Sequence, residues 1–261
     1  MTNPILTIEN LTKRFGGNTA VSDINMDVMP QETVAIIGPN GAGKTTFYNM
    51  VSGRMQPSRG KIILEDKDIT GMPPHRISRM GVSRSFQINN IFPDMTVQEN
   101  VEVVLSAYHG HSRKLFNIAS RNTEIQNEAL SYLERLGIAE LKDRRAEVIS
   151  YGDKRLLEIS MVLATRPKLV LLDEPTAGMT PEETRRTTKL VKKLAEGGHY
   201  TFLITEHDMG VVFDLADRIL VMHRGEKLFA GKPEEVRNHP EVRRAYLGDE
   251  DEDEPTKGVN A

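Results

Sequence analysis

A glycine-rich segment with the pattern Gly-x4-Gly-Lys-Thr is the strongest chemical signal in the sequence. It follows the apolar stretch 33–37 and opens an expected helix at about residues 43–52. Glycines let backbone N–H groups turn inward around phosphate oxygens, and the following helix directs the positive end of its dipole at the anion. Lys44 can neutralise charge on the β- and γ-phosphates, and Thr45 can ligate magnesium. The predicted phosphate-binding residues are Gly38, Pro39, Asn40, Gly41, Ala42, Gly43, Lys44, Thr45 and Thr46.

Two adjacent carboxylates end a second apolar stretch, at residues 169–172. Ligands of open α/β sheets bind outside the carboxyl ends of the strands, so Asp173 and Glu174 are expected at the phosphate site. Asp173 is predicted to hold the magnesium shell, and Glu174 to polarise a water molecule in line with the γ-phosphate. Without the phosphate loop, the two acids could simply mark the point at which a buried strand reaches the surface. Together with the loop they predict a phosphate-loop nucleoside triphosphatase.

The elements that must position these groups alternate between strand and helix. Strands are expected near residues 5–9, 24–28, 33–37, 61–65, 169–172, 201–205, 218–222 and 227–230. A helix is expected near 153–163, and another from Pro181, with Thr180 as its cap. The alternation predicts an α/β fold with a mostly parallel sheet that is covered on both faces.

The region from about residue 88 to 152 departs from this alternation. Thr96 and Glu99 have the spacing of a capping box, and apolar residues follow at helical spacing through Tyr108. A second helical stripe runs near residues 125–136, and Gly137 is a plausible stop. We therefore expect a helical insert within a single domain of residues 1–248.

The composition is typical of a soluble globular protein. The 261 residues contain no cysteine, which excludes a disulfide framework, thiol catalysis and cysteine-ligated metal sites. No run of ~18 apolar residues occurs, so no helix is expected to span a bilayer. The N-terminal residues lack the basic flank and apolar core of a secretory signal. A cytoplasmic chain is expected, unless a partner carries it elsewhere.

The net charge of −3 is unevenly spread. Residues 249–254 alternate Asp and Glu, and without that run and Lys257 the chain has 33 basic and 31 acidic residues. This near-neutral body argues against nucleic-acid binding. The stretch 249–261 is expected to be a solvated, disordered tail, because like charges repel and it has little apolar surface to bury.

The segment Ile149-Ser150-Tyr151-Gly152-Asp153-Lys154-Arg155 lies just before the strand that carries Asp173, and here the sequence resembles the ATP-binding-cassette (ABC) family. The family signature at this place is Leu-Ser-Gly-Gly-Gln, which Ser150 and Gly152 match and the residue after each does not. The resemblance implies that this helix start reaches the γ-phosphate held by a partner subunit. A carboxylate at Asp153 should repel that phosphate unless Lys154 or Arg155 neutralises it. Taken alone, the segment is a serine-capped helix start.

Further positions match the same family. Gln87 matches the glutamine that approaches magnesium and the attacking water, and His207 matches the histidine that contacts the γ-phosphate. Phe15 matches the aromatic residue that stacks on adenine, with Val21 beneath it. The resemblance implies ATP and Mg²⁺ as cofactors. It also implies a phosphate-loop (RecA-like) core with an antiparallel β subdomain and a helical subdomain. The implied catalytic residues are Glu174, His207 and Gln87, and the implied metal ligands are Thr45, Gln87 and Asp173.

Within the family, residues 6–248 look most like the ATP-binding subunits of branched-chain amino-acid uptake systems. The segments 80–87, 92–100 and 244–248 suggest this. Cassettes for urea, amides or lipopolysaccharide, and soluble cassette ATPases without a transport role, are the alternatives. Thr180 stands where many cassettes end a dimer-contact loop with aspartate, and it cannot supply that carboxylate.

The resemblance implies a transport ATPase that works with partners. Two cassettes, identical or homologous, would sandwich two ATP molecules head to tail, and ATP would favour the closed dimer. Transmembrane permease subunits would hold the chain at the cytoplasmic face of the inner membrane as a peripheral subunit, and a solute-binding protein would act indirectly. The apolar stretch 88–95 is expected either to contact a permease helix or to pack within the fold.

Overall fold

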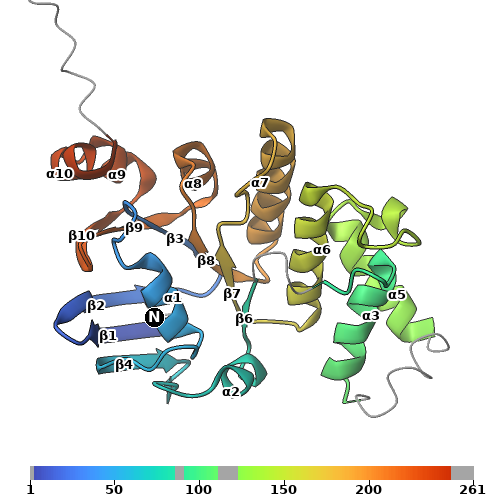
Figure 1. Cartoon of the computed structure of the whole chain (residues 1–261), viewed down its shortest axis with the longest axis horizontal. Coiled ribbons are helices and arrows are strands. Elements are labelled where there is room, and N and C mark those ends of the chain that lie inside the picture. Colours follow the sequence, from blue (N-terminus) through green and yellow to red (C-terminus); the bar gives the residue numbers. More distant parts are fainter. Residues whose placement is uncertain (1–2, 86–90, 111–122, 248–261) are drawn as a thin grey trace, which may run out of the picture.

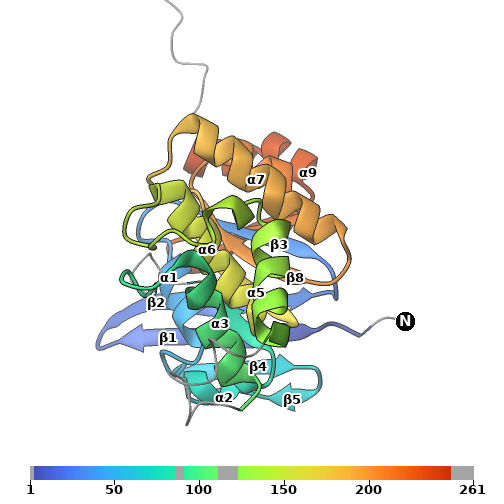
Figure 2. The ribbon, with the colours of Figure 1, turned by 90° about the vertical axis from the view of Figure 1, so that its right-hand side faces the viewer.

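The computed structural model describes residues 3–85, 91–110 and 123–247 (Figure 1). Within these residues the chain forms two β-sheets and the helices that cover them. Helices α3 (Val97–Tyr108), α5 (Thr123–Arg135) and α6 (Tyr151–Ala164) form the right-hand end of the molecule in Figure 1. Figure 2 looks onto this helical end. The α/β architecture with an additional antiparallel sheet and a helical region confirms the predicted fold class.

The first sheet is antiparallel and has the strand order β2-β1-β4-β5. Its strands are β1 (Leu6–Phe15), β2 (Asn18–Val28), β4 (Arg59–Leu64) and β5 (Lys67–Asp68). Leu6 is paired with Val28 on one side and with Leu64 on the other. Leu6 and Ile8 are buried while Glu9 is exposed, as in a strand with one face on a core. Strands β1 and β2 are longer than predicted because both continue to the tight turn between them.

The second sheet has the order β10-β9-β3-β8-β7-β6, and all its neighbours are parallel except β9 and β10. Strands β3, β7 and β8 are buried on both faces almost throughout, which explains why they are continuously apolar or nearly so. Because the parallel strands end at one edge, the loop after β3 and the two acids at the end of β7 are brought together. The strands are β3 (Thr33–Ile37), β6 (Val82–Arg84), β7 (Leu169–Asp173), β8 (Thr201–Thr205), β9 (Arg218–His223) and β10 (Glu226–Gly231).

The central sheet separates two hydrophobic cores, as alternation along β7 makes plain. Leu169 and Leu171 pack with the antiparallel sheet and α1 (Lys44–Val51), whereas Val170 and Leu172 pack with the helical region. A third cluster joins β3 and β9 to the C-terminal helices. The other helices within the described residues are α2 (Pro74–Arg79), α7 (Pro181–Glu196), α8 (Met209–Leu215), α9 (Pro233–Asn238) and α10 (Pro240–Val242), with a 3₁₀ turn at Ala139–Leu141 and a π turn at Arg243–Leu247.

Side-chain caps set where the helices begin. The Thr96 hydroxyl accepts from the Glu99 N–H (3.1 Å), and the Glu99 carboxylate accepts from the Thr96 N–H (2.7 Å), which confirms the predicted capping box of α3. Thr180 caps α7 in the same way. Gly137 lies just past α5 with φ 62°, in the left-handed region expected of a helix stop. Strand β6 and helix α2 were not predicted, because elements this short carry no periodic pattern.

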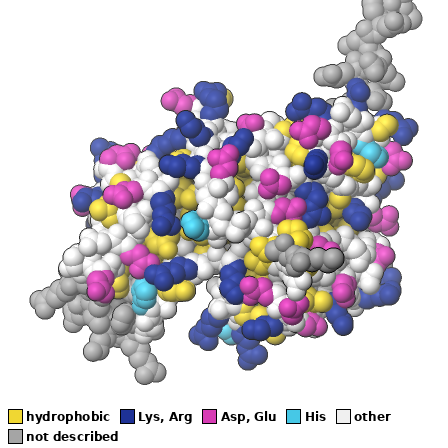
Figure 3. Space-filling model, turned by 180° about the vertical axis from the view of Figure 1, so that it is seen from behind, with side chains coloured by type: hydrophobic (Ala, Val, Ile, Leu, Met, Phe, Trp, Pro, Cys, Tyr) yellow, Lys and Arg dark blue, Asp and Glu magenta, His cyan; other side chains and the backbone are white. Residues whose placement is uncertain are grey.

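A groove of ≈ 1110 Å³ separates α2 and β6 from the helices α3 and α6. Phe92 and Tyr108 line it and keep large apolar surfaces exposed. Figure 3 shows a notch at the lower edge of the molecule, with basic, acidic and apolar side chains interspersed around it. Across residues 3–85, 91–110 and 123–247, none of the helices has both the length and the apolar character that crossing a membrane requires.

Candidate active site

The predicted phosphate loop connects β3 to α1, and its glycines allow close backbone approach. A Cβ atom on Gly38 would lie 2.1 Å from the Met222 carbonyl oxygen, and one on Gly43 would lie 2.4 Å from the Ala20 carbonyl oxygen. Gly41 faces open space, but its φ of 82° itself favours glycine. Glycine at these positions is therefore needed to pack the loop against neighbouring backbone and to give the loop its left-handed conformation.

Lys44 is the first residue of α1, and its side chain bends back over the loop. Its Nζ donates to the carbonyl oxygens of Gly38 (2.6 Å) and Pro39 (3.2 Å), and the residue is buried. Burial lowers the pKa of Lys44, while the negative charges of Glu174 and Asp173 oppose that change. The lysine of the loop, Asp173 at the end of β7 and Glu174 directly after it thus lie in one site, as predicted from the strand ends.

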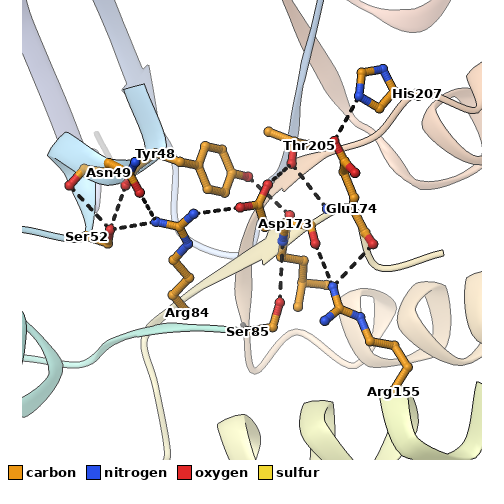
Figure 4. A network of polar contacts seen from close by, with 11 residues as sticks. Tyr48, Asn49, Ser52, Arg84, Ser85, Arg155, Asp173, Glu174, Thr205 and His207 are labelled. Atoms are coloured by element: carbon orange, nitrogen blue, oxygen red, sulfur yellow. Dashed lines mark hydrogen bonds and ion pairs between the residues drawn. The ribbon is translucent and has the colours of Figure 1, made fainter. Parts of the chain in front are cut away.

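Asp173 is held on both sides (Figure 4). Its Oδ2 accepts from Nη2 of Arg84 (2.6 Å), and its Oδ1 accepts from the Thr205 hydroxyl (2.7 Å). The backbone N–H of Asp173 points to the Ser85 hydroxyl (3.4 Å). Side chains from β6 and β8 therefore orient the acid at the end of β7, because these are the strands on either side of it.

Glu174 follows directly and has a left-handed backbone with φ 48°. Such a conformation costs on the order of 1 kcal/mol in a residue other than glycine. It is maintained by the Glu174 N–H, which donates to the carbonyl (3.0 Å) and hydroxyl (3.2 Å) oxygens of Thr205. The side chain turns to His207, whose Nε2 lies 2.8 Å from the Glu174 Oε1 (Figure 4). The two predicted catalytic side chains thus meet, although 33 positions separate them.

Arg155 comes from α6 and holds the same loop from below. Its side chain is buried and pairs with Glu158, and its Nη2 donates to the carbonyl oxygens of Asp173 (2.6 Å) and Glu174 (3.3 Å). It thereby supports the strained backbone of Glu174 (Figure 4). The Arg155 guanidinium is thus bonded beneath Asp173 and Glu174, and Lys154 donates to the Glu147 carbonyl oxygen (2.8 Å). Neither supplies the neutralising partner that the sequence suggested for Asp153.

Asp153 is neutralised by α7 instead. Its Oδ1 pairs with Nη1 of Arg186 at 2.9 Å, and Nη2 of the same arginine donates to the Gly137 carbonyl oxygen (2.6 Å). The other oxygen of Asp153 accepts from the Ser150 hydroxyl (2.9 Å), which itself accepts from the Asp153 N–H (3.1 Å). Ser150 is thus the N-cap of α6, as one reading of the sequence had it.

Gly152 lies against the start of α7. Its N–H donates to Oε1 of Glu183 (3.1 Å), and Oε2 of that carboxylate accepts from the Thr180 N–H and hydroxyl (each 3.0 Å). These hydrogen bonds lower the pKa of Glu183, and those from Thr180 have the largest effect. Thr180 supplies no carboxylate itself, but Glu183 places one beside it.

The predicted adenine-stacking residues lie at the end of the β1–β2 hairpin. Phe15 is 48% exposed, with Nζ of Lys13 5.2 Å from the centre of its ring. Val21 is fully buried, and its Cγ2 would lie 3.2 Å from a Cβ on Gly43. Phe15 therefore presents part of an aromatic surface at the end of this hairpin, and Val21 of the same hairpin packs against the loop. Gln87 and the acidic stretch 249–254 lie outside the described residues.

The oxygen atoms of Thr45 and Asp173 are of the kind that binds a magnesium ion. Tyr48 and Thr45 are three residues apart and share a face of α1, and the Tyr48 hydroxyl donates to the Leu172 carbonyl oxygen (3.4 Å). Thr45 lies one turn earlier on α1 and is exposed, so its hydroxyl is accessible to a ligand. A hydroxyl and a carboxylate are the hard oxygen ligands that Mg²⁺ prefers.

Several residues that shape this site were not predicted from the sequence. Glu206 is buried, and its Oε1 accepts from the N–H (2.8 Å) and the hydroxyl (2.7 Å) of Thr176, which ties the loop after Glu174 to the strand before His207. Glu206 could have been predicted as a site residue from its position directly before His207, at the end of an apolar strand. Arg84 and Arg186 carried no such signal, because an isolated arginine does not reveal its partner.

The chain matches two family models. The model described as ABC transporter covers residues 21–177, and the model described as branched-chain amino acid ATP-binding cassette transporter covers residues 226–252. Among curated proteins, the high-affinity branched-chain amino acid transport ATP-binding protein LivG of Escherichia coli is 41% identical over 257 residues, 95% of this chain and 100% of that protein. The protein of the same description named BraF, from Pseudomonas aeruginosa, is 41% identical with the same coverage.

A lipopolysaccharide export system ATP-binding protein, LptB of Haemophilus influenzae, is 35% identical over 94% of this chain and 98% of its own length. Among solved structures, the ADP conformation of an ATP-binding cassette of an ABC transporter has a TM-score of 0.83 at 32% identity and covers 95% of this chain and 100% of its own. A nucleotide-free cassette has a TM-score of 0.81 at 31% identity and covers 94% and 99%.

Proposed function

This chain belongs to the ABC transporter family, and we propose that it is the ATP-binding and ATP-hydrolysing subunit of an importer of branched-chain amino acids. The contact of Glu174 with His207 at 2.8 Å, beside Lys44, is the observation that carries the hydrolytic role. The match at residues 226–252 and the 41% identity to LivG support branched-chain amino acids over lipopolysaccharide.

In the proposed reaction, the loop of residues 38–46 binds the β- and γ-phosphates of ATP through the backbone N–H groups of its residues other than Pro39, together with Lys44. Glu174 accepts a proton from the attacking water, and His207 orients that carboxylate and contacts the γ-phosphate. The exposed ring of Phe15 stacks on adenine. Mg²⁺ held by Thr45 and Asp173, together with Gln87, would neutralise charge on the phosphates.

We further propose that two cassettes enclose two ATP molecules. Each γ-phosphate would then meet the Ser150–Gly152 helix start of the other subunit, where the positive end of α6 favours an anion. The N–H of Gly152 is bonded to Glu183, so this contact would have to rearrange as the dimer closes. ATP would act as the ligand that favours the closed state, and hydrolysis would remove that preference.

Arg186→Ala should weaken ATP-driven dimerisation about tenfold at low salt, because Asp153 is then left uncompensated near the partner's phosphate. The deficit should shrink as salt is added. Light scattering against ATP concentration in a hydrolysis-blocked background measures it. Arg185→Ala, the exposed neighbouring arginine, is the matched control, and Asp153→Asn combined with Arg186→Ala should restore the dimer. If Arg186→Ala dimerises as well as the natural protein at low salt, Asp153 does not lie near the partner's phosphate.

The groove between α2, β6, α3 and α6 is our proposed docking site for a permease helix. Phe92 and Tyr108 offer it apolar surface. Such docking would hold the chain at the cytoplasmic face of the membrane, with a solute-binding protein acting through the permease. Residues 1–248 remain our proposed single domain, with the helical insert at about 88–152.

Transport itself is tested by uptake in cells that carry Glu174→Gln in place of the natural residue. Leucine, isoleucine and valine uptake at low concentration should fall to the level of a deletion strain, while glucose uptake should not change. Uptake of all three amino acids at the natural rate in the deletion strain would refute the assigned substrate class. Co-purification of membrane subunits with the tagged chain identifies the permease.

A further inference from the structure

Arg84 is a buried arginine that the proposed mechanism does not use. It is the last residue of β6, and its side chain is 8% exposed. β6 runs parallel to β7, with Arg84 opposite Leu171, so the guanidinium reaches the end of β7. The same side chain lines the groove between β6 and the helical region.

The guanidinium joins two functional elements to β6 (Figure 4). Nη1 donates to Oδ1 of Asn49 (2.7 Å) and to the hydroxyl of Ser52 (3.0 Å), at the end of the helix that begins with Lys44. Nη2 donates to Oδ2 of Asp173 (2.6 Å). The centre of the guanidinium lies 5.6 Å from the centre of the Tyr48 ring. A guanidinium is planar and rigid, so its two nitrogen atoms fix Asp173 and α1 relative to each other.

Two roles for this contact predict opposite effects. If Arg84 only neutralises Asp173, removing its positive charge should favour a cation at that carboxylate. If Arg84 positions the carboxylate, losing its two-sided contact should impair cation binding even when the charge is kept. Lysine separates the two roles, because it keeps the charge on a single nitrogen and cannot bond Asn49 and Asp173 in the same fixed geometry.

We propose that Arg84 is a positioning residue of the magnesium site: it holds Asp173 at a set place relative to the phosphate-loop helix before the metal arrives. The proposal rests on the proposed function, because it concerns nucleotide and Mg²⁺ at this site. Asp173 retains access to a ligand, since its side chain is 22% exposed and each carboxylate oxygen accepts more than one bond.

The test compares the affinity for a non-hydrolysable β,γ-imido analogue of ATP in MgCl₂ and in EDTA. The ratio of the two affinities is the gain due to magnesium. Arg84→Lys and Arg84→Gln should both lower this gain about tenfold and leave the affinity in EDTA unchanged. Asn49→Ala keeps the pair with Asp173 but removes one anchor on α1, so it should lower the gain by a smaller factor. If Arg84→Gln does not fold, the comparison of Arg84→Lys and Asn49→Ala with the natural protein provides the test.

Arg218→Lys is the matched control, because Arg218 pairs with Glu32 (2.7 Å) at the start of β9, at the end of the sheet away from the acids. It should leave the gain as in the natural protein. A natural gain in Arg84→Lys with a raised gain in Arg84→Gln would overturn the proposal in favour of charge neutralisation. An equal loss in EDTA and in MgCl₂ would also overturn it, because Arg84 would then support the phosphate loop. Failure of the natural protein to bind the analogue would instead refute the proposed function.

Discussion

Glu174→Gln should lower the rate of ATP hydrolysis at least about 100-fold and leave ATP affinity within a few-fold of the natural value. Glutamine has nearly the same shape but cannot accept the proton of the attacking water. The backbone that places the side chain depends on Thr205 and Arg155, which the substitution does not touch. Phosphate release and equilibrium binding of a fluorescent ATP analogue measure the two quantities. The unhydrolysed complex should also accumulate as a dimer.

Glu182→Gln is the control for this substitution, since Glu182 is an exposed residue in the first turn of α7 and carries the same change in charge. It should hydrolyse ATP at the natural rate. Equal activity of the Glu174 and Glu182 variants would sink the assignment of Glu174 as the proton acceptor. A loss of binding together with hydrolysis would mean that Glu174 supports the loop.

Lys44→Ala should reduce nucleotide affinity about 100-fold, equivalent to about 2.8 kcal/mol, the upper range for a hydrogen bond to a charged group. In the free protein the Lys44 ammonium is bonded to the carbonyl oxygens of Gly38 and Pro39, so it lies within the loop that would surround the phosphates. Alanine at the first position of α1 is a good helix former, so the helix itself should persist. Fluorescence titration with ATP measures the loss.

The pH dependence of binding provides a second measurement on Lys44. Burial lowers the pKa of this lysine in the free protein, so on raising the pH it loses its proton earlier than an ordinary lysine. Phosphate binding favours the protonated form, so affinity should fall as the pH rises on the alkaline side, and Lys44→Ala should lose this dependence. Lys61→Ala, an exposed lysine of β4, is the control. An alkaline fall that persists in Lys44→Ala would assign the effect to another group.

The parts of the site that the sequence predicted are those in which chemistry lies next to its own structural signal. The phosphate loop follows an apolar strand directly, and Asp173 and Glu174 end another. Because parallel strands share a carboxyl edge, two such motifs were enough to predict that the acids and Lys44 meet, although β3 and β7 are not neighbours in the sheet. His207 needed the family resemblance, since a single histidine after a strand has no pattern of its own.

The suggestion for Asp153 failed for a physical reason. Lys154 and Arg155 are adjacent in sequence, but successive residues of a helix point in different directions. Arg155 therefore enters the core beneath Glu174, and Lys154 reaches the carbonyl of Glu147. The partner of Asp153 is Arg186, which α7 brings alongside the start of α6.

Local order in the chain was thus sufficient to predict the phosphate loop, the acid pair and the capped helix starts, because each depends on residues a few positions apart. The alternation of apolar segments along the whole chain predicted the α/β class, and the family resemblance added the antiparallel sheet. The partners of Arg84, Arg155 and Arg186 emerged only from the folded molecule. Which strand lies beside β7, and which helix beside α6, depends on how the buried faces of the whole chain pack, and an arginine pairs with the carboxylate or carbonyl that this packing brings within reach.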